Sequence, residues 1–289
     1  MLMDYWIKKF GTDMKIGDNE LIAPDAEMEN SSILFRGKGN ILFLAPGVHL
    51  NNVVIKFLGN NSVVYISKSK YPCAFQVNMF HDSVFYMGEN NSINGKKAVF
   101  QLSEYKNIFI GADNMLSYGL TLRVADPHLI YSATTKERVN PSKSVYIGDH
   151  VWIGQNVNIL KGVRIGSGSI IAGEAVLTKP VPSNTTFGGN PAKKLKEGVF
   201  WMRPSVHAFT SAHTEKWQRH DGDEFIFTNK NTYSFATIEK ELTRLAHTQD
   251  KLTFLQHLPK DKNRFFMDVD VNKSQRKSGK SHFFNWGKK

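Results

Sequence analysis

The sequence contains a single cysteine, Cys73, among 289 residues. One cysteine cannot form a disulfide bond within the chain, and a zinc site built from several cysteines is excluded. No stretch approaches the roughly 20 consecutive apolar residues of a membrane-spanning helix. The first ten residues lack a long apolar run and a small-residue cleavage site, so we expect no signal peptide. We therefore expect a soluble, cytoplasmic protein.

Acidic residues are scarce relative to basic ones. The chain has 37 Lys and Arg against 26 Asp and Glu, which gives a formal net charge of +11. Such a surface is either simply solvated or binds an anionic cofactor, an anionic polymer or a membrane face. We find no nucleic-acid-binding motif and no platform of interleaved aromatic and basic residues, so no nucleic-acid partner is expected.

The most regular feature of the sequence is a period of six residues. A branched aliphatic residue recurs in six consecutive hexads: Ile147, Ile153, Ile159, Ile165, Ile171 and Leu177. Glycine follows it at Gly148, Gly154 and Gly166, where a corner needs a permissive backbone. Neither the helical period of 3.6 nor the strand period of 2 explains this repeat, which is typical of a short-repeat β-solenoid.

The repeat ends in a second motif, Gly-Asn-Pro-Ala-Lys at residues 189–193. The hexads and this ending resemble the hexapeptide-repeat acyltransferases over residues 108–196. The resemblance implies a left-handed parallel β-helix and acetyl-CoA as co-substrate. It also implies a homotrimer, in which each active site lies between neighbouring solenoids and takes residues from two chains.

His128 is the candidate general base, because histidine exchanges protons near neutral pH. It ends a coil at the root of a polar insertion, residues 131–144, and Trp152 follows it by 24 residues. This pairing resembles the capsular polysaccharide and sialic acid O-acetyltransferases, which implies that His128 is catalytic and that Trp152 lines the acceptor or pantetheine site. Packing at a trimer interface is a second interpretation of Trp152. Whether Asp126 orients His128 stays open, and His150 is expected on the surface.

The resemblance also assigns residues to acetyl-CoA. Thr178, Lys179, Lys193 and Lys194 would hold its phosphates through hydrogen bonds and charge, while Ala172 and Gly173 leave the backbone open to the pantetheine arm. The full set of candidate cofactor-binding residues is Trp152, Ala172, Gly173, Thr178, Lys179, Asn190, Pro191, Lys193 and Lys194. Glu174 and Pro180 depart from the family pattern, where a small or amide residue and an Asp are usual.

We expect an all-β fold: a left-handed parallel β-helix with an extruded loop and a small C-terminal α+β extension. Residues 1–107 would form a strand-rich region of irregular coils, with runs at 41–44, 53–55, 63–66, 84–86 and 98–100. An independent small β domain is the alternative. Residues 108–196 would form the hexapeptide-repeat β-helix.

Residues 197–258 would form the extension, with a strand at 225–227. One amphipathic helix would begin at its N-cap Thr237 and end before Pro259, and its apolar stripe would pack on the solenoid or on a neighbouring subunit. Residues 259–289 hold nine Lys and Arg against three Asp, and predict a basic tail. This tail is either solvated or contacts acidic polysaccharide or anionic lipid at the inner face of the membrane.

The resemblance implies an acetyl-CoA-dependent O-acetyltransferase that acetylates hydroxyl groups of a bacterial capsular polysaccharide by direct transfer. No metal site is expected, since no two histidines stand five apart as in the γ-class carbonic anhydrases, which share this fold. Two alternatives remain: an N-acetyltransferase of an amino sugar or nucleotide sugar, and a non-catalytic β-helix adaptor in polysaccharide assembly. Whether the acceptor is a polymer or a monomer also stays open.

Overall fold

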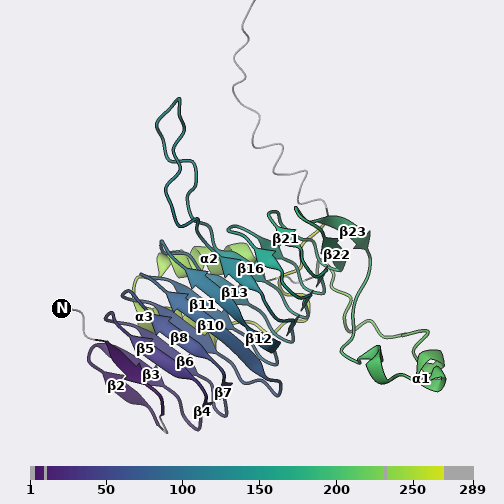
Figure 1. Ribbon diagram of the computed structural model, residues 1–289, viewed down its shortest axis with the longest axis horizontal. Coiled ribbons are helices and arrows are strands. Elements are labelled where there is room, and N and C mark those ends of the chain that lie inside the picture. The colour runs from purple at the N-terminus through teal and green to yellow at the C-terminus, as the bar shows by residue number, and fades with distance from the viewer. Residues whose placement is uncertain (1–3, 10–11, 231–232, 270–289) are drawn as a thin grey trace, which may run out of the picture.

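The computed structural model describes residues 4–9, 12–230 and 233–269. In this part of the chain, short parallel strands wind into a β-solenoid of about seven coils (Figure 1). Each coil contributes one strand to each of three faces, which gives the solenoid a three-sided cross-section.

In each coil the first strand lies on face 3, the second on face 1 and the third on face 2. Face 1 therefore consists of the second strands. They are β4 (Glu27–Glu29), β7 (His49–Asn51), the start of β10 (Cys73–Met79), the start of β12 (Ser92–Leu102), β14 (Met115–Leu116), β17 (Trp152–Ile153), β20 (Ile170–Ile171) and β22 (Thr185–Gly188). β23 (Lys193–Glu197) pairs antiparallel with β22.

Face 2 contains the third strand of each coil. They are β5 (Ser32–Phe35), β8 (Val54–Phe57), the end of β10, the end of β12, β15 (Thr121–Arg123), β18 (Asn158–Ile159) and β21 (Val176–Leu177). β1 (Tyr5–Ile7) extends this face through an antiparallel pairing with β5.

Face 3 holds the strand that opens each coil. They are β3 (Asn19–Ile22), β6 (Ile41–Leu44), β9 (Val63–Ile66), β11 (Val84–Met87), β13 (Ile108–Ile110), β16 (Val145–Ile147) and β19 (Arg164–Ile165). β2 (Met14–Ile16) pairs antiparallel with β3. We call the corners between faces 1 and 2, 2 and 3, and 3 and 1 the first, second and third corners.

The hexad aliphatics fill the interior, as predicted. Ile147, Ile153, Ile159 and Ile165 are fully buried, and Ile171 and Leu177 are 1% exposed. Parallel pairing stacks them in columns, with Ile147 between Ile110 and Ile165 on face 3. Each such side chain contributes roughly 1.5–3 kcal/mol through burial, so the columns are the main source of stability.

The N-terminal strands form coils of the same solenoid. The five runs expected as strands lie within or overlap β6, β8, β9, β11 and β12. Parallel pairing is continuous from β3 through β6, β9, β11 and β13 to β16 on face 3. This continuity favours coils over a separate small β domain, while the division of the chain at residues 107, 196 and 258 stays a prediction.

Two helices, α2 (Phe235–Arg244) and α3 (Thr248–Gln256), cover face 3. Ile238 and Leu242 of α2 and Leu252 and Leu255 of α3 pack in one buried cluster with the outward side chains of that face. The prediction of a single helix capped by Thr237 was wrong. Ser234 is the N-cap, and the extended backbone at Leu245 ends α2, so that both helices turn their apolar sides onto the sheet.

Residues 225–227 are not a strand. The side chain of Asn184 takes the place of a partner strand: its amide donates to the Phe225 carbonyl at 2.8 Å and accepts from the Phe227 N–H at 2.8 Å. Beyond it, η1 (Val206–Ala208) and α1 (Ser211–Lys216) project from the solenoid with no buried residue (Figure 1).

The first part of the predicted basic tail, residues 259–269, is folded against the solenoid. Arg264 is 7% exposed and Phe265 is 1% exposed, because residues 259–269 pack against face 3 and the third corner. The part of the predicted tail from residue 270 onward, including its charge excess, lies outside the described residues. Within the described residues, no helix has the length and apolar character needed to cross a membrane.

Candidate functional site

The insertion predicted after His128 is a long arm that leaves the second corner between β15 and β16 (Figure 1). Its two branches pair through an antiparallel bridge between Tyr131 and Arg138 and a 2.9 Å hydrogen bond from the Val139 N–H to the Ile130 carbonyl. His128 lies at the root of this arm and is exposed.

Asn140 joins the two branches at the root. Its side-chain amide donates to the His128 carbonyl at 2.8 Å and to Asp126 Oδ2 at 3.1 Å, and its Oδ1 accepts from the Ile130 N–H at 2.9 Å. Asn140 is 5% exposed. Its hydrogen bonds therefore fix the backbone that carries His128.

Asp126 anchors the arm to the next coil. Lys161 Nζ lies 2.5 Å from Asp126 Oδ2 and 3.1 Å from the Asn140 carbonyl. The hydrogen bond from Lys161 lowers the pKa of Asp126. The carboxylate of Asp126 thus pairs with Lys161 and Asn140. We therefore assign to Asp126 the role of holding the arm in place rather than of orienting the His128 imidazole.

A second anchor joins the arm to the coil below. The terminal nitrogens Nη1 and Nη2 of Arg138 donate to the two carboxylate oxygens of Glu104, at 2.7 and 2.8 Å, and Ser142 donates a hydrogen bond to the same carboxylate. The bonds from Arg138 and then Ser142 lower the pKa of Glu104 to about 2.

Two hollows flank the root. The first, of about 350 Å³, is lined by His128 together with Phe80, Gln101, Arg123 and Leu129. The second, of about 470 Å³, continues along the second corner and is strongly basic. Five cations line it, and one carboxylate: Lys106, Lys143, Lys161, Arg164, Lys179 and Glu239.

The basic hollow also contains Thr178 and Pro180. Its single carboxylate, Glu239, already accepts hydrogen bonds from Tyr146 and, at 3.3 Å, from Ser144. The hollow therefore presents a surplus of positive charge, which suits phosphate groups. The structure brings His128, Thr178 and Lys179 to the same corner of the solenoid.

Trp152 lies on a different face. It stands on face 1 between Met115 and Ile170 in the parallel register, and its side chain is 40% exposed. The indole of Trp201, buried, lies beside it with ring centroids 6.2 Å apart. Trp152 therefore belongs to an open, largely apolar column and does not share a face with His128.

The other predicted cofactor residues stack at the first corner and on face 1. The N–H of Ala172 donates a hydrogen bond to the Phe187 carbonyl at 2.8 Å. Gly173 packs closely against Gly154 of the preceding coil, because a Cβ atom added at Gly154 would lie 2.5 Å from the Gly173 nitrogen. The loop of Asn190 and Pro191 lies against the start of β21, while Lys193 and Lys194 are exposed on β23.

The two departures from the family pattern have separate surroundings. Glu174 accepts a 2.7 Å hydrogen bond from Asn156 and has a left-handed φ of 62° at the first corner. Pro180 lines the basic hollow. One chain thus divides the predicted site between two surfaces, with His128, Thr178 and Lys179 on one and Trp152, Lys193 and Lys194 on the other.

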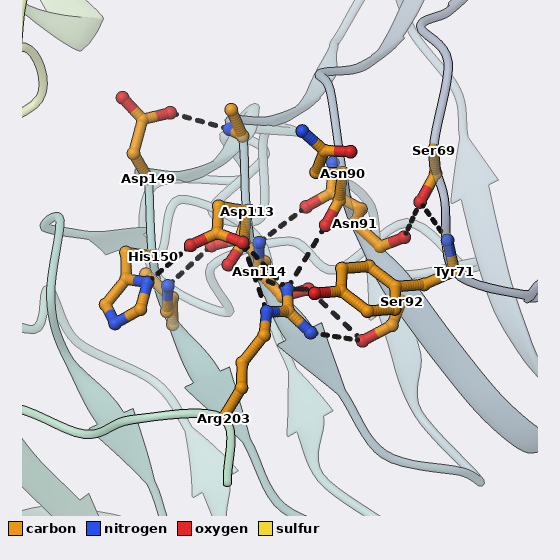
Figure 2. Close-up of polar contacts among 12 residues, drawn as sticks. Ser69, Tyr71, Asn90, Asn91, Ser92, Asp113, Asn114, Asp149, His150 and Arg203 are labelled. Atoms are coloured by element: carbon orange, nitrogen blue, oxygen red, sulfur yellow. Dashed lines mark hydrogen bonds and ion pairs between the residues drawn. The ribbon is translucent and has the colours of Figure 1, made fainter.

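The third corner carries a buried polar cluster (Figure 2). The prediction that His150 lies on the surface was wrong, since it is 3% exposed and lies between the rings of Trp201 and Phe225, at 4.2 and 3.9 Å. Its Nδ1 faces Asp113 at 2.7 Å and its Nε2 faces the Trp201 carbonyl at 3.0 Å.

Arg203 completes this cluster. It contacts Asp113 at 3.0 Å and lies over the ring of Tyr71 at 4.2 Å, as Figure 2 shows. Burial raises the pKa of Asp113, but the hydrogen bond from His150 and the charge of Arg203 outweigh it, so the pKa is lowered. The cluster fastens the segment after residue 199 to the solenoid and thereby places Trp201 beside Trp152.

Comparison with known proteins identifies the family. The family model described as bacterial transferase hexapeptide (six repeats) matches residues 144–179. A polysialic acid O-acetyltransferase of Neisseria meningitidis is 33% identical over 174 residues, which cover 60% of this chain and 80% of that protein. The chain belongs to the hexapeptide-repeat acetyltransferases.

Other relatives agree with this membership. A polysialic acid O-acetyltransferase of Escherichia coli O1:K1 is 37% identical over 97 residues, which are 34% of this chain and only 32% of that protein's length. The crystal structure of the polySia-specific acetyltransferase NeuO, at 28% identity, matches with a TM-score of 0.59 over 69% of this chain and 93% of the other. The crystal structure of the polysialic acid O-acetyltransferase OatWY, also at 28% identity, matches with a TM-score of 0.56 over 64% of this chain and 87% of the other.

Three residues that shape the candidate site could not be found from the sequence. Asn140, Arg138 and Trp201 act through contacts with distant residues, and no motif marks them. The only related sequence feature was the polar composition of residues 131–144, which contain Arg138 and Asn140. It indicated an insertion but not the hydrogen bonds within it.

Proposed function

We propose that the chain transfers an acetyl group from acetyl-CoA to a hydroxyl group of a bacterial capsular polysaccharide, with His128 as the general base. The observation that carries this proposal is that His128 lines a hollow at the second corner, and that a second, strongly basic hollow lies along the same corner. The similarity to polysialic acid O-acetyltransferases supports the acceptor class.

The proposed transfer is direct. The imidazole of His128 takes the proton of a sugar hydroxyl, the hydroxyl oxygen attacks the thioester carbonyl, and a new C–O bond forms as the C–S bond breaks. The proton on His128 then passes to the departing thiolate. Acetyl-CoA supplies the activated acetyl group, so the chain itself needs no acyl-enzyme intermediate.

The basic hollow fits the phosphate end of the co-substrate. Lys179 and Arg164, with Lys106, Lys143 and Lys161, offer charge and N–H donors, and Thr178 adds a hydroxyl. The backbone at Ala172 and Gly173, free of large side chains, would border the pantetheine arm. Asn190, Pro191, Lys193 and Lys194 would contact the cofactor from face 1.

The division of the site between two surfaces supports a homotrimer. Residues on different faces of one solenoid can meet when face 1 of one copy faces the second corner of the next. The arm supports the same arrangement, because four large apolar side chains on it are more than half exposed: Leu129, Ile130, Tyr131 and Val139. A neighbouring copy would cover them.

We place this reaction in the cytoplasm, where acetyl-CoA is made, with capsule assembly at the inner face of the membrane as the setting. The predicted association through the basic tail concerns residues outside the described part of the chain. It therefore rests on the charge of the sequence alone.

A panel of acceptors tests the proposed activity. The purified chain is incubated with acetyl-CoA and, in separate reactions, with capsular polysaccharides, monosaccharides and amino sugars, and free thiol is measured. We expect thiol release with a capsular polysaccharide and a product whose acetyl groups are removed by mild base, as esters are. Base-resistant acetyl groups would indicate N-acetylation, and no thiol release with any acceptor would favour an adaptor.

A further inference from the structure

A polar column runs along face 2 from the hollow beside His128 toward the N-terminus. The parallel register aligns Lys56 with Asn78, Asn78 with Gln101, and Gln101 with Arg123. Their neighbours Ile55, Val77, Phe100 and Leu122 are fully buried in the interior. Because side chains alternate along a strand, the four aligned residues point outward.

This column has free polar groups at its surface. Neither Lys56 nor Arg123 has an ion-pair partner within the described ranges, and the Gln101 amide makes no hydrogen bond there. Gln76 donates to Asn78 Oδ1 at 3.0 Å, which orients the Asn78 amide and leaves its N–H groups outward. Amides offer both donors and acceptors, as sugar hydroxyls require, and the two cations suit carboxylates.

The column and the hollow are continuous, since Gln101 and Arg123 line both. Phe80, 39% exposed, stands at the same hollow and offers an apolar surface for a sugar ring. Strands of a sheet lie about 4.8 Å apart, so the three steps from Arg123 to Lys56 span roughly 14 Å. This length exceeds one monosaccharide.

We propose that an anionic glycan chain of several sugar residues binds along face 2, from the hollow beside His128 over Gln101 and Asn78 to Lys56. The reacting sugar occupies the hollow, and the rest of the chain lies across the strands of the N-terminal coils. This inference rests on the proposed function and adds where the polysaccharide lies beyond the reacting sugar. It also gives the N-terminal coils a role in binding.

Length-fractionated polysialic acid tests this column. Values of kcat/KM are measured with long chains and with the dimer for the parent, Lys56→Glu, Asn78→Ala and a control, Lys15→Glu. Lys15 is exposed on β2 at face 3, so its variant makes the same charge change away from the column. Thermal melting confirms that each variant is folded.

We expect Lys56→Glu to lower kcat/KM for long chains by roughly fivefold, the upper end of the range for one exposed charge. The dimer should lose a smaller factor, and Lys15→Glu should match the parent on both acceptors. A ratio of long-chain to dimer kcat/KM that is unchanged in Lys56→Glu and Asn78→Ala overturns the column. A parent without preference for long chains overturns it also, but leaves the proposed acetyl transfer intact.

A binding measurement separates this inference from the proposed function. If the parent acetylates neither acceptor, polysialic acid is not its substrate, and equilibrium binding of fluorescent polysialic acid decides on the column, while the acceptor panel decides on the proposed function. Binding that strengthens with chain length and weakens in Lys56→Glu supports it. Equal binding by parent and Lys56→Glu, or no binding, contradicts it.

Discussion

The side-chain amide of Asn140 donates a 2.8 Å hydrogen bond to the backbone carbonyl of His128. The two residues stand on opposite branches of the arm, twelve positions apart in the sequence. The same amide holds Asp126, which in turn binds Lys161 of the following coil. The proposed base is therefore positioned by its backbone, through a buried side chain that has no part in the chemistry.

Replacement of Asn140 tests this positioning. Asn140→Ala should lower kcat by roughly 10–100-fold because a small displacement of the base is costly to the reaction. KM for acetyl-CoA should stay nearly constant, since the basic hollow is unchanged. The unpaired buried groups should lower the free energy of unfolding by about 1–3 kcal/mol. Asn51→Ala, on β7, is the matched control, and an unchanged kcat in folded Asn140→Ala would contradict the role.

The anchor between Glu104 and Arg138 predicts a pH dependence. The pKa of Glu104 lies at about 2, below its ordinary value of 4.5, so its ion pair stabilises the fold above pH 4.5 and is lost as pH falls through about 2. Glu104→Gln should therefore lower the melting temperature at pH 7 and match the parent near pH 2. The effect is small, roughly 0.2–1 kcal/mol, because the pair is partly exposed.

Melting curves of both proteins at several pH values check this prediction. The gap between parent and Glu104→Gln should narrow steadily from pH 5 to pH 2. A gap that is constant across this range would show that the carboxylate charge does not stabilise the arm.

Helices α2 and α3 and residues 259–269 together cover face 3, and we call them the cover. We predict that residues 259–269 are needed for stability. Phe265 stacks on Phe235 with ring centroids 4.8 Å apart and meets Phe109 edge-on at 5.3 Å. Phe265→Ala should lower the free energy of unfolding by about 3–5 kcal/mol through the cavity it leaves. Phe209→Ala, outside the cover, should cost much less in the same denaturant titration. Equal losses would show that the cover adds little.

The basic hollow predicts how acetyl-CoA binds. Acetyl-CoA should raise the melting temperature because it binds only the folded chain, and Lys179→Ala combined with Lys193→Ala should reduce the rise. Lys15→Ala, exposed on β2 away from both surfaces of the site, is the control. If millimolar acetyl-CoA neither raises the melting temperature of the parent nor gives a heat of binding in calorimetry, acetyl-CoA is not the co-substrate.

The division of the site between two copies predicts complementation. His128→Ala and Trp152→Ala should each be nearly inactive alone. When the two are co-expressed, about a quarter of the sites in random mixed trimers would receive both intact residues, so activity should return. Mixed samples that stay as inactive as the single variants would show that each chain provides its own site or that the chain is not a trimer.

The sequence allowed the regular part of the fold to be predicted, because each hexad carries its own interior residue. The N-terminal coils were harder to recognise because their face-3 strands open at residues 19, 41, 63 and 84, a spacing of 21 to 22 residues that is not a multiple of six. Corners of such coils absorb extra residues without disturbing the stacked strands. Periodicity is therefore weak there even though the packing is regular.

The site was only partly predictable, for reasons visible at two histidines. His128 could be singled out because it follows a coil and precedes an insertion. His150 was misplaced on the surface because the rings that bury it, Trp201 and Phe225, are 51 and 75 positions away. Likewise, nothing local shows that Leu245 breaks the helix, since the break follows from how α2 and α3 both reach face 3.

The central claim is acetyl transfer to a polysaccharide hydroxyl with His128 as base. The most direct test measures acetyl-CoA turnover on the capsular polysaccharide that the acceptor panel identifies, by the parent and by His128→Ala, with His257→Ala as a control on the exposed end of α3. We predict O-acetylated polymer from the parent and from His257→Ala, and a rate roughly 10²–10⁴-fold lower for folded His128→Ala. Turnover by folded His128→Ala within a few-fold of the parent would contradict the account.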